Sequence, residues 1–115
     1  MKGQNFQKRK SKKKFLVKIH KAYREIVAVS DVGLVGKKFE EGNLQLEVNE
    51  QFYGGKDSTI VDEKKLLKIL KEAERNDACF NFVGKYTVEI AIKAGLVDKN
   101  CVIKIQGVPH ALVLL

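Results

Sequence analysis

The sequence predicts an α+β fold in which a mostly antiparallel sheet is covered by two helices, with an extended basic tail at the N-terminus. Short segments that alternate between apolar and polar residues lie near both ends of the chain, as is typical of half-buried strands. Two segments in the second half place apolar residues at helical spacing. The resulting order of strands, helix, short strand, helix and strands is typical of α+β proteins. With 115 residues, we expect a polybasic extension at residues 1–14 and a single globular domain at residues 15–115.

Three strands are predicted in the first half of the globular part. Residues 15–20 alternate in polarity, and residues 25–30 (EIVAVS) form the second strand. The short polar connection at residues 21–24 predicts that these two strands form an antiparallel hairpin. Residues 44–48 alternate with period two and form the clearest half-buried strand of the chain. Residues 31–43 are rich in glycine and charge, and we expect them to form loops and a turn.

The strongest helical signal begins at Asp62. An aspartate is a good N-cap, and Glu63 places a negative charge in the first turn, where it suits the helix dipole. We expect this helix to end near Asn76. Its predicted core face consists of Leu66, Leu67, Leu70 and Ala73.

Residues 84–95 fit two kinds of secondary structure. Their β-branched residues favour a strand, but their apolar residues also fit one face of a helix, and Gly95 lies where a C-terminal cap is expected. We therefore predict a helix. The apolar residues 78–83 before it form either a strand or a buried connection. After it, we predict a strand at residues 101–105, a tight connection at residues 107–110 and an apolar strand at residues 111–115 that pairs with the previous one.

Positive charge is concentrated in the first fourteen residues. The chain has 22 Lys and Arg against 14 Asp and Glu, a net charge of +8, and beyond residue 14 the balance is only +1. Such a block is typical of an arm for an anionic partner, which is a nucleic acid, an anionic membrane or an acidic protein. The apolar run that follows is too short for a signal peptide, and no run is long enough to cross a membrane. The basic residues of the tail are Lys2, Lys8, Arg9, Lys10, Lys12, Lys13 and Lys14.

A second basic feature lies on the first predicted helix. Its members, which we call the α-helical basic stripe, are Lys64, Lys68, Lys71 and Arg75. Steps of four, three and four place them on one side of a helix. The stripe is either a solvated surface, compensated in part by Glu72 and Glu74, or a contact for a phosphate backbone, which would relieve the repulsion and release counterions. The basic tail favours the second interpretation. Phe6 and Tyr23 are candidates for stacking on exposed bases.

Four residues are potential zinc ligands, namely His20, Cys79, Cys101 and His110. They are not paired at the close spacing of a zinc knuckle, and we expect neither a metal nor another cofactor. The two cysteines are more simply explained as buried free thiols in a reducing cytosol, although a disulfide between them is an alternative.

Residues 83–87 (VGKYT) faintly resemble a phosphate-binding loop. The pattern needs Gly at position 79 and Ser or Thr directly after the lysine, but this chain has Cys79 and Tyr86. We therefore reject nucleotide hydrolysis, although a helix that starts at Gly84 would offer free N–H groups to one phosphate. No spacing connects Cys79 with His110, and no nucleophile elbow is present, so we predict no catalytic residues and no enzyme.

Several segments resemble a small archaeal family known as domain of unknown function 424. They are LVGKKFEEG at residues 34–42, LEV at 46–48, FYGG at 52–55, VG at 83–84, AIKAGLV at 91–97 and GVPHA at 107–111. The resemblance extends from Phe15 to the end of the chain, and it leaves out the tail and residues 73–80. It implies a compact α/β domain without an established activity and an association with translation. It also implies that a site shared by the family lies at the Tyr53-Gly54-Gly55 and Pro109-His110 loops.

These features lead to one main hypothesis, a structural RNA-binding protein of the archaeal ribosome, with the small subunit favoured. Its partners would be ribosomal RNA and neighbouring ribosomal proteins, without a membrane or a small-molecule substrate, and its location would be the cytoplasm. The alternative is a small enzyme or ligand-binding module with its site at the Tyr53-Gly54-Gly55 and Pro109-His110 loops. A third hypothesis is an adaptor that other proteins bind through its apolar C-terminal strand.

Overall fold

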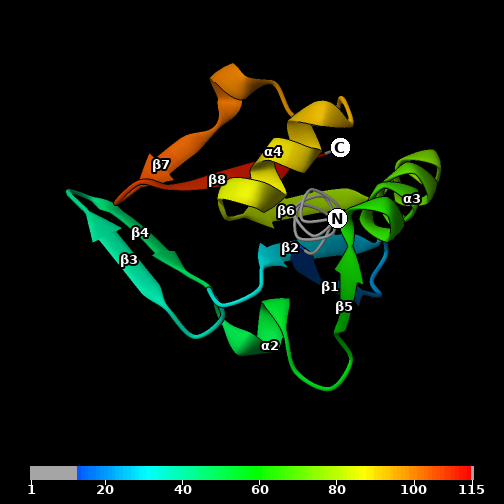
Figure 1. The fold of residues 1–115 in the computed structure, drawn as a ribbon, viewed down its shortest axis with the longest axis horizontal. Coiled ribbons are helices and arrows are strands. Elements are labelled where there is room, and N and C mark those ends of the chain that lie inside the picture. The colour runs from blue at the N-terminus through cyan, green and yellow to red at the C-terminus, as the bar shows by residue number, and fades with distance from the viewer. Residues whose placement is uncertain (1–12, 115) are drawn as a thin grey trace, which may run out of the picture.

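The computed structural model describes residues 13–114, which form two sheets and three α-helices (Figure 1). In chain order the elements are β1 Lys14–His20, β2 Ile26–Asp31, β3 Lys38–Glu41, β4 Leu44–Glu47, α2 Glu50–Tyr53, β5 Thr59–Asp62, α3 Glu63–Arg75, β6 Cys79–Val83, α4 Lys85–Lys93, a 3₁₀ helix Lys99–Cys101, β7 Ile103–Ile105 and β8 Val108–Val113. The large sheet has the strand order β5-β1-β2-β6-β8-β7, and β3 pairs with β4 in a sheet of their own.

The large sheet is antiparallel except at its centre. β1 pairs antiparallel with β2 and with β5, and β8 pairs antiparallel with β6 and with β7. β2 and β6 are parallel, which requires the chain to cross back over the sheet, and α3 provides the last part of that crossover. The predicted α+β class with a mostly antiparallel sheet is therefore confirmed.

The first hydrophobic core lies between the large sheet and the helices α3 and α4. Alternate residues of the central strands point to this side, where the helices supply leucines and small or β-branched residues. Both predicted helices are confirmed, and Asp62 caps α3 by accepting a hydrogen bond from the Lys65 N–H at 2.9 Å. The fully or nearly buried members of this core include Phe15, Val27, Val29, Leu66, Leu70, Phe80, Phe82, Val88 and Ala91.

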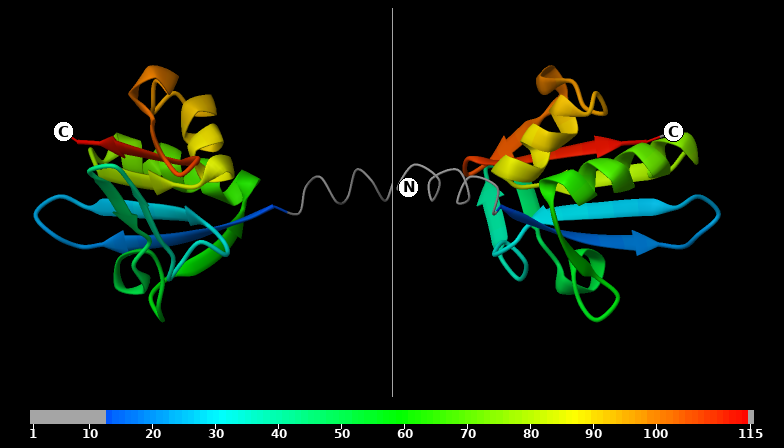
Figure 2. Two further views of the ribbon diagram at one scale, coloured as in Figure 1. Left: turned by 90° about the vertical axis from the view of Figure 1, so that its left-hand side faces the viewer. Right: turned by 45° about the vertical axis from the view of Figure 1, so that its right-hand side comes forward.

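A second, smaller core covers the opposite side of the sheet. Ala28 and Val83 of the sheet pack there with Leu46, Val48 and Tyr53 from the β3–β4 hairpin and α2. Figure 2 shows α2 and α4 on opposite sides of the sheet. The expectation that two helices cover the sheet is thus correct for one face only. A β-hairpin and a one-turn helix cover the other.

Four short elements were not predicted, namely β3, α2, β5 and the 3₁₀ helix. β3 and β5 have four residues each, and most of these residues are exposed. Strands with so few buried residues show no strong alternation of polarity in the sequence. The apolar residues 78–83, for which two interpretations were open, form the strand β6.

Two predictions about the C-terminal part are wrong. The turn lies at Gln106 and Gly107, which both have positive φ values (52° and 80°), and Ile105 pairs directly with Val108. Pro109 and His110 therefore belong to strand β8 and not to a loop.

The two free thiols are not both core residues. Cys101 ends the 3₁₀ helix and is exposed, and Cys79 is half-buried.

Candidate nucleic-acid interface and polar pocket

The α-helical basic stripe lies on the exposed side of α3. All four of its side chains are solvent-exposed, because the apolar residues of the helix face the sheet. Arg75 forms an ion pair with Glu72 at 3.2 Å. Within residues 13–114, Lys64, Lys68 and Lys71 form no ion pair with a carboxylate. These three ammonium groups are therefore available to an external anion.

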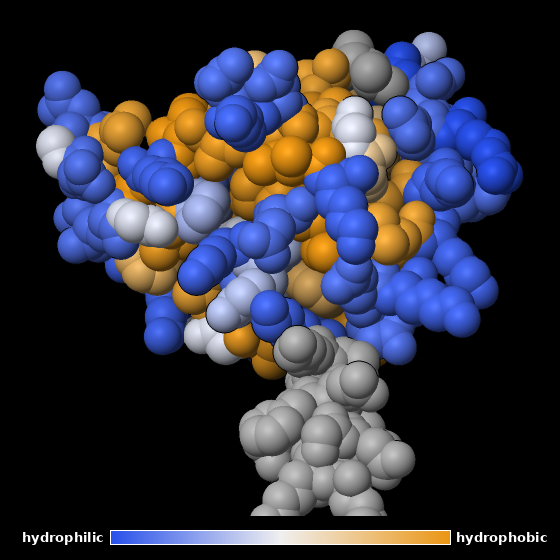
Figure 3. All heavy atoms as spheres, turned by 45° about the horizontal axis from the view of Figure 1, so that its top comes forward, coloured by the Kyte–Doolittle hydropathy of each residue, from blue (hydrophilic) through white to orange (hydrophobic). Residues whose placement is uncertain are grey.

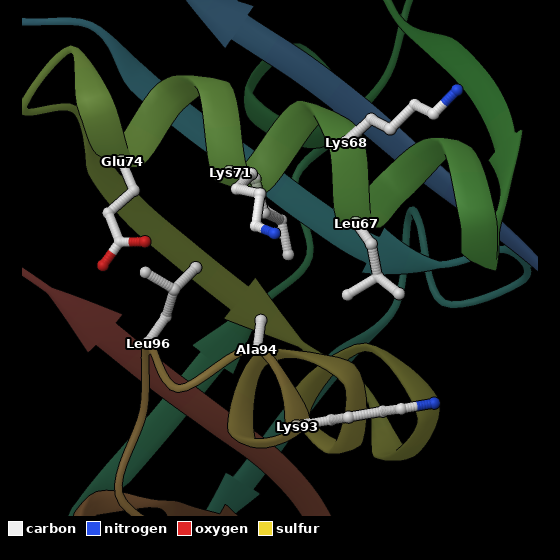
Figure 4. A pocket seen from close by; sticks show the side chains of 8 residues that line it. Leu67, Lys68, Lys71, Glu74, Lys93, Ala94 and Leu96 are labelled. Atoms are coloured by element: carbon white, nitrogen blue, oxygen red, sulfur yellow. The ribbon is translucent and has the colours of Figure 1, made fainter.

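A groove of about 380 Å³ runs beside this stripe, between α3 and α4. Its apolar lining comes from Leu67, Leu70, Ala94 and Leu96. In Figure 4, Lys71 points from α3 toward the groove, while Lys68 points away from it. Lys93 lies at the end of α4 and donates a hydrogen bond to Glu63 Oε2 at 2.9 Å, which connects the two helices. In Figure 3, hydrophilic side chains cover the side of the molecule where α3 lies, next to exposed apolar surface.

The N-terminal tail enters the fold at the start of α3. Lys14 is the first residue of β1, and it lies opposite Asp62, whose side chain caps α3. Lys13 is exposed and its ammonium group lies 4.0 Å above the ring centre of Tyr86 at the start of α4, a cation–π contact. Two basic residues of the tail thus lie beside the first turns of both helices. The other tail residues predicted to bind RNA, and Phe6, lie outside the described residues.

At the start of α4, a carboxylate of the protein binds the N–H groups of Tyr86 and Thr87. The Asp31 carboxylate accepts hydrogen bonds from the Tyr86 N–H at 3.1 Å and from the Thr87 N–H and hydroxyl at 2.7 Å each. Gly84 precedes the helix with φ +112°, and a Cβ at that position would lie 2.4 Å from the Asp31 Cγ. A protein carboxylate therefore occupies the place where a phosphate could have bound.

A cluster of polar side chains lies in a pocket on the opposite face of the sheet. The Tyr53 hydroxyl donates a hydrogen bond to Asn81 Oδ1, and His110 Nε2 lies 3.1 Å from the same oxygen. Tyr53 comes from the end of α2, Asn81 from β6 and His110 from β8. The structure thus brings together Tyr53 and His110 from the two segments that the family resemblance indicated, and both residues lie in regular secondary structure. Asn81 was not predicted as a site residue, although it is the lone polar residue in the apolar run ACFNFV.

Burial changes the pKa values of two groups in this cluster. It raises the pKa of the Tyr53 phenol well above its ordinary value, so the hydroxyl keeps its proton. It lowers the pKa of His110, because the charged ring would lose part of its hydration. His110 is therefore neutral at pH 7, and its Nε2 carries a hydrogen, since the amide oxygen of Asn81 can only accept.

The lowered pKa of His110 predicts a pH dependence of stability. The unfolded chain binds a proton at His110 more readily than the folded protein does. The neutral histidine therefore makes its full contribution to the free energy of unfolding at pH values above its ordinary pKa of 6.5. This contribution is lost as the pH falls below that value. Urea unfolding at several pH values from 7.5 to 5 would measure this for the wild type and for His110→Gln, whose amide can still donate to Asn81. We expect the variant to lose less stability over this range, and an identical pH dependence would contradict the assignment.

The four potential zinc ligands are not brought together. His20 donates a hydrogen bond from Nε2 to the Phe52 carbonyl at 2.7 Å and stacks on the Phe52 ring, and His110 is held at Asn81. Within the part of the chain that the structure describes, no group of three His, Cys, Asp or Glu side chains is placed to hold a metal ion. In residues 13–114, no helix combines the length and the apolar character needed to cross a bilayer.

A family model described as a protein of unknown function, DUF424, matches residues 19–115. The chain belongs to the DUF424 family. A crystal structure of an uncharacterised conserved protein from Methanopyrus kandleri is similar to this DUF424 protein with a TM-score of 0.73 and 24% sequence identity, and the match covers 87% of this chain and 90% of that one. At this identity the likeness shows that the two share a fold. Among proteins of curated function, none matches this DUF424 chain.

Proposed function

We propose that this DUF424 protein binds structured RNA, and specifically ribosomal RNA in the archaeal ribosome, through its basic tail and the α-helical basic stripe. The observation that carries the proposal is the position of Lys14, which pairs with the capping residue Asp62 of α3. The tail therefore joins the domain next to the N-terminal end of α3, where the stripe begins. Lys13 and Lys14, the tail residues that the structure describes, thus lie close to the first turn of α3, although the tail and the stripe are far apart in sequence.

The chemistry of this surface suits a phosphate backbone. The stripe runs from Lys64 to Arg75 of α3, so it extends over about 17 Å and spans several successive phosphates of a nucleic acid. Lysines at successive turns repel each other, and this repulsion disappears when phosphates neutralise them and release counterions. Lysines read charge and shape and not base identity, so we propose recognition of folded RNA, with neighbouring ribosomal proteins completing the contact.

Sucrose-gradient sedimentation of archaeal lysate at low and high salt tests the proposal. We expect the protein to sediment with ribosomal particles, the small subunit being favoured, at low salt and to dissociate as the salt concentration rises. If it stays at the top of the gradient at low salt, the ribosomal assignment is wrong.

A charge variant of α3 tests the proposed surface itself. The triple substitution Lys64→Gln, Lys68→Gln, Lys71→Gln should reduce affinity for ribosomal RNA about tenfold to a hundredfold and lower the log–log salt slope by about 2 to 3, measured by filter binding. The matched control is Lys37→Gln, Lys99→Gln, Lys104→Gln, which removes the same charge from exposed lysines elsewhere. Equal losses in both variants would mean that only net charge matters, and the α3 surface would be rejected.

A further inference from the structure

An open pocket of about 520 Å³ lies on the side of the sheet that α3 and α4 do not cover. Its walls come from β4, α2, β6 and β8, so it joins segments that are distant in sequence. The volume is within the range of small-molecule sites in proteins. Most of the lining side chains carry amide or aromatic groups: Gln45, Asn49, Gln51, Phe52, Tyr53, Asn81 and His110.

The hydrogen bonds at Asn81 determine what the pocket can offer to a ligand. Asn81 Oδ1 accepts from the Tyr53 hydroxyl and from His110 Nε2, so this oxygen is already engaged. At Asn81 and Tyr53, the groups that remain are the Asn81 amide hydrogens, which donate, and the lone pairs of the Tyr53 oxygen, which accept. A donor thus lies next to an acceptor in the pocket. Because Tyr53 is 3% exposed, its orientation is fixed by packing.

The charges of the pocket exclude anionic ligands. Among residues 13–114, Glu47 is the one carboxylic acid in the pocket lining, and no lysine or arginine lines it. Lys18 lies nearby, but its ammonium group donates to the Gln51 carbonyl at 2.7 Å. A phosphate or carboxylate would be placed near Glu47 without a cation to compensate it. The part of the ligand that enters is therefore not an anion, and a neutral group fits there.

An aromatic ring with a fixed position completes the pocket. Phe52 lines it and is stacked on His20 with ring centres 4.6 Å apart. The Nε2 hydrogen bond of His20 to the Phe52 carbonyl holds this pair in place. Aromatic side chains of this kind provide surfaces on which flat rings pack.

We propose that the pocket binds a nucleobase, either of a free nucleoside or of an unpaired RNA nucleotide. A base is flat, neutral and carries a donor and an acceptor side by side on its edge, which complements the Asn81 amide and the Tyr53 oxygen. Its ring packs against Phe52, and its sugar and phosphate remain outside, away from Glu47. The site is separate from the α3 surface and does not depend on RNA binding there.

Adenosine is the probe for the first test, titrated into the full-length protein and followed by ¹⁵N NMR. We expect the Asn81 side-chain amide signals to shift, and ribose 5-phosphate, which lacks a base, to leave them unchanged. Tyr53→Phe should weaken adenosine binding at least fivefold. Tyr23→Phe, the same change at a fully exposed tyrosine outside the pocket, keeps the ring on which a base could stack and should alter the binding less than twofold. Phe52→Leu keeps an apolar side chain but removes the flat ring, and this variant should also weaken binding several-fold while its spectrum shows a folded protein.

A hexanucleotide of adenosine distinguishes the two sources of the base. If it shifts the Asn81 amide, and Tyr53→Phe abolishes that shift, the base comes from RNA. If adenosine alone shifts the amide, the ligand is a free nucleoside. Repeating the titration of adenosine with the α3 triple variant, in which RNA binding through the stripe is removed, separates this pocket from the proposed function. The inference is overturned if neither probe shifts the Asn81 amide, or if Tyr53→Phe and Tyr23→Phe bind adenosine equally.

Discussion

Substitution of Gly84 by alanine is expected to destabilise the folded protein by about 3 kcal/mol, which corresponds to a decrease in Tm of at least about 12 °C for a domain of this size. Gly84 has φ +112°, a backbone conformation that residues with a side chain rarely adopt. Its added Cβ would also lie 2.4 Å from Asp31 Cγ and within 2.7 Å of both carboxylate oxygens. The carboxylate would have to move, and its hydrogen bonds to Tyr86 and Thr87 would weaken or break.

Gly33 supplies the matched control for this prediction. It has φ +105°, and a Cβ there meets no atom within 4 Å, so Gly33→Ala carries the backbone strain without the collision. We expect it to cost about 1 kcal/mol. Urea unfolding of both variants measures the difference, and similar losses at the two glycines would show that the contact with Asp31 is unimportant.

A double-mutant cycle with Asp31→Ala isolates the collision. Asp31→Ala alone should cost about 1 to 2 kcal/mol, because it removes the cap of α4 and leaves the buried Thr87 hydroxyl without its partner. In that background Gly84→Ala should cost no more than Gly33→Ala, because the carboxylate is absent. Additive effects of the two substitutions would contradict the proposed coupling.

The elements that sequence analysis predicted correctly are those specified by neighbouring residues. α3 has a capping aspartate, an acidic first turn and leucines at helical spacing, and all of these signals lie within fifteen residues. β1 and β2 alternate in polarity and are joined by a short polar connection. β5 has no such local signal, since its position depends on pairing with β1, more than forty residues earlier in the chain.

The same reasoning explains which parts of the candidate sites were found. The basic stripe follows from helical spacing alone, so its exposure was predictable from α3. Tyr53 and His110 were indicated by the family resemblance, but the residue that joins them, Asn81, is 28 and 29 positions away from them. Asp31 caps a helix that starts more than fifty residues later. Contacts over such separations depend on the order of strands in the sheet, which local sequence patterns do not determine.

Deletion of residues 1–12 is expected to reduce the affinity for ribosomal RNA by about two to three orders of magnitude near 0.1 M salt. The deletion removes Lys2, Lys8, Arg9, Lys10 and Lys12 and leaves β1 complete, because this strand begins at Lys14. If all seven basic residues of the tail contact phosphates, the tail should contribute about −5 to the log–log salt slope of the full-length protein. The deletion removes five of these residues and should therefore reduce the magnitude of the slope by about 3.5 to 4.5.

A scrambled tail decides between charge and sequence as the cause of this loss. A variant in which residues 1–12 are reordered with the same composition should keep the affinity within about threefold, because phosphates are bound through charge and not through the order of lysines. A variant with the five basic residues of that segment replaced by glutamine should behave as the deletion does. Filter binding to ribosomal RNA at several salt concentrations measures all three. If the deleted protein binds as tightly as the full chain, the tail has no part in recognition, and the continuity between Lys14 and α3 would be a structural feature without the proposed role.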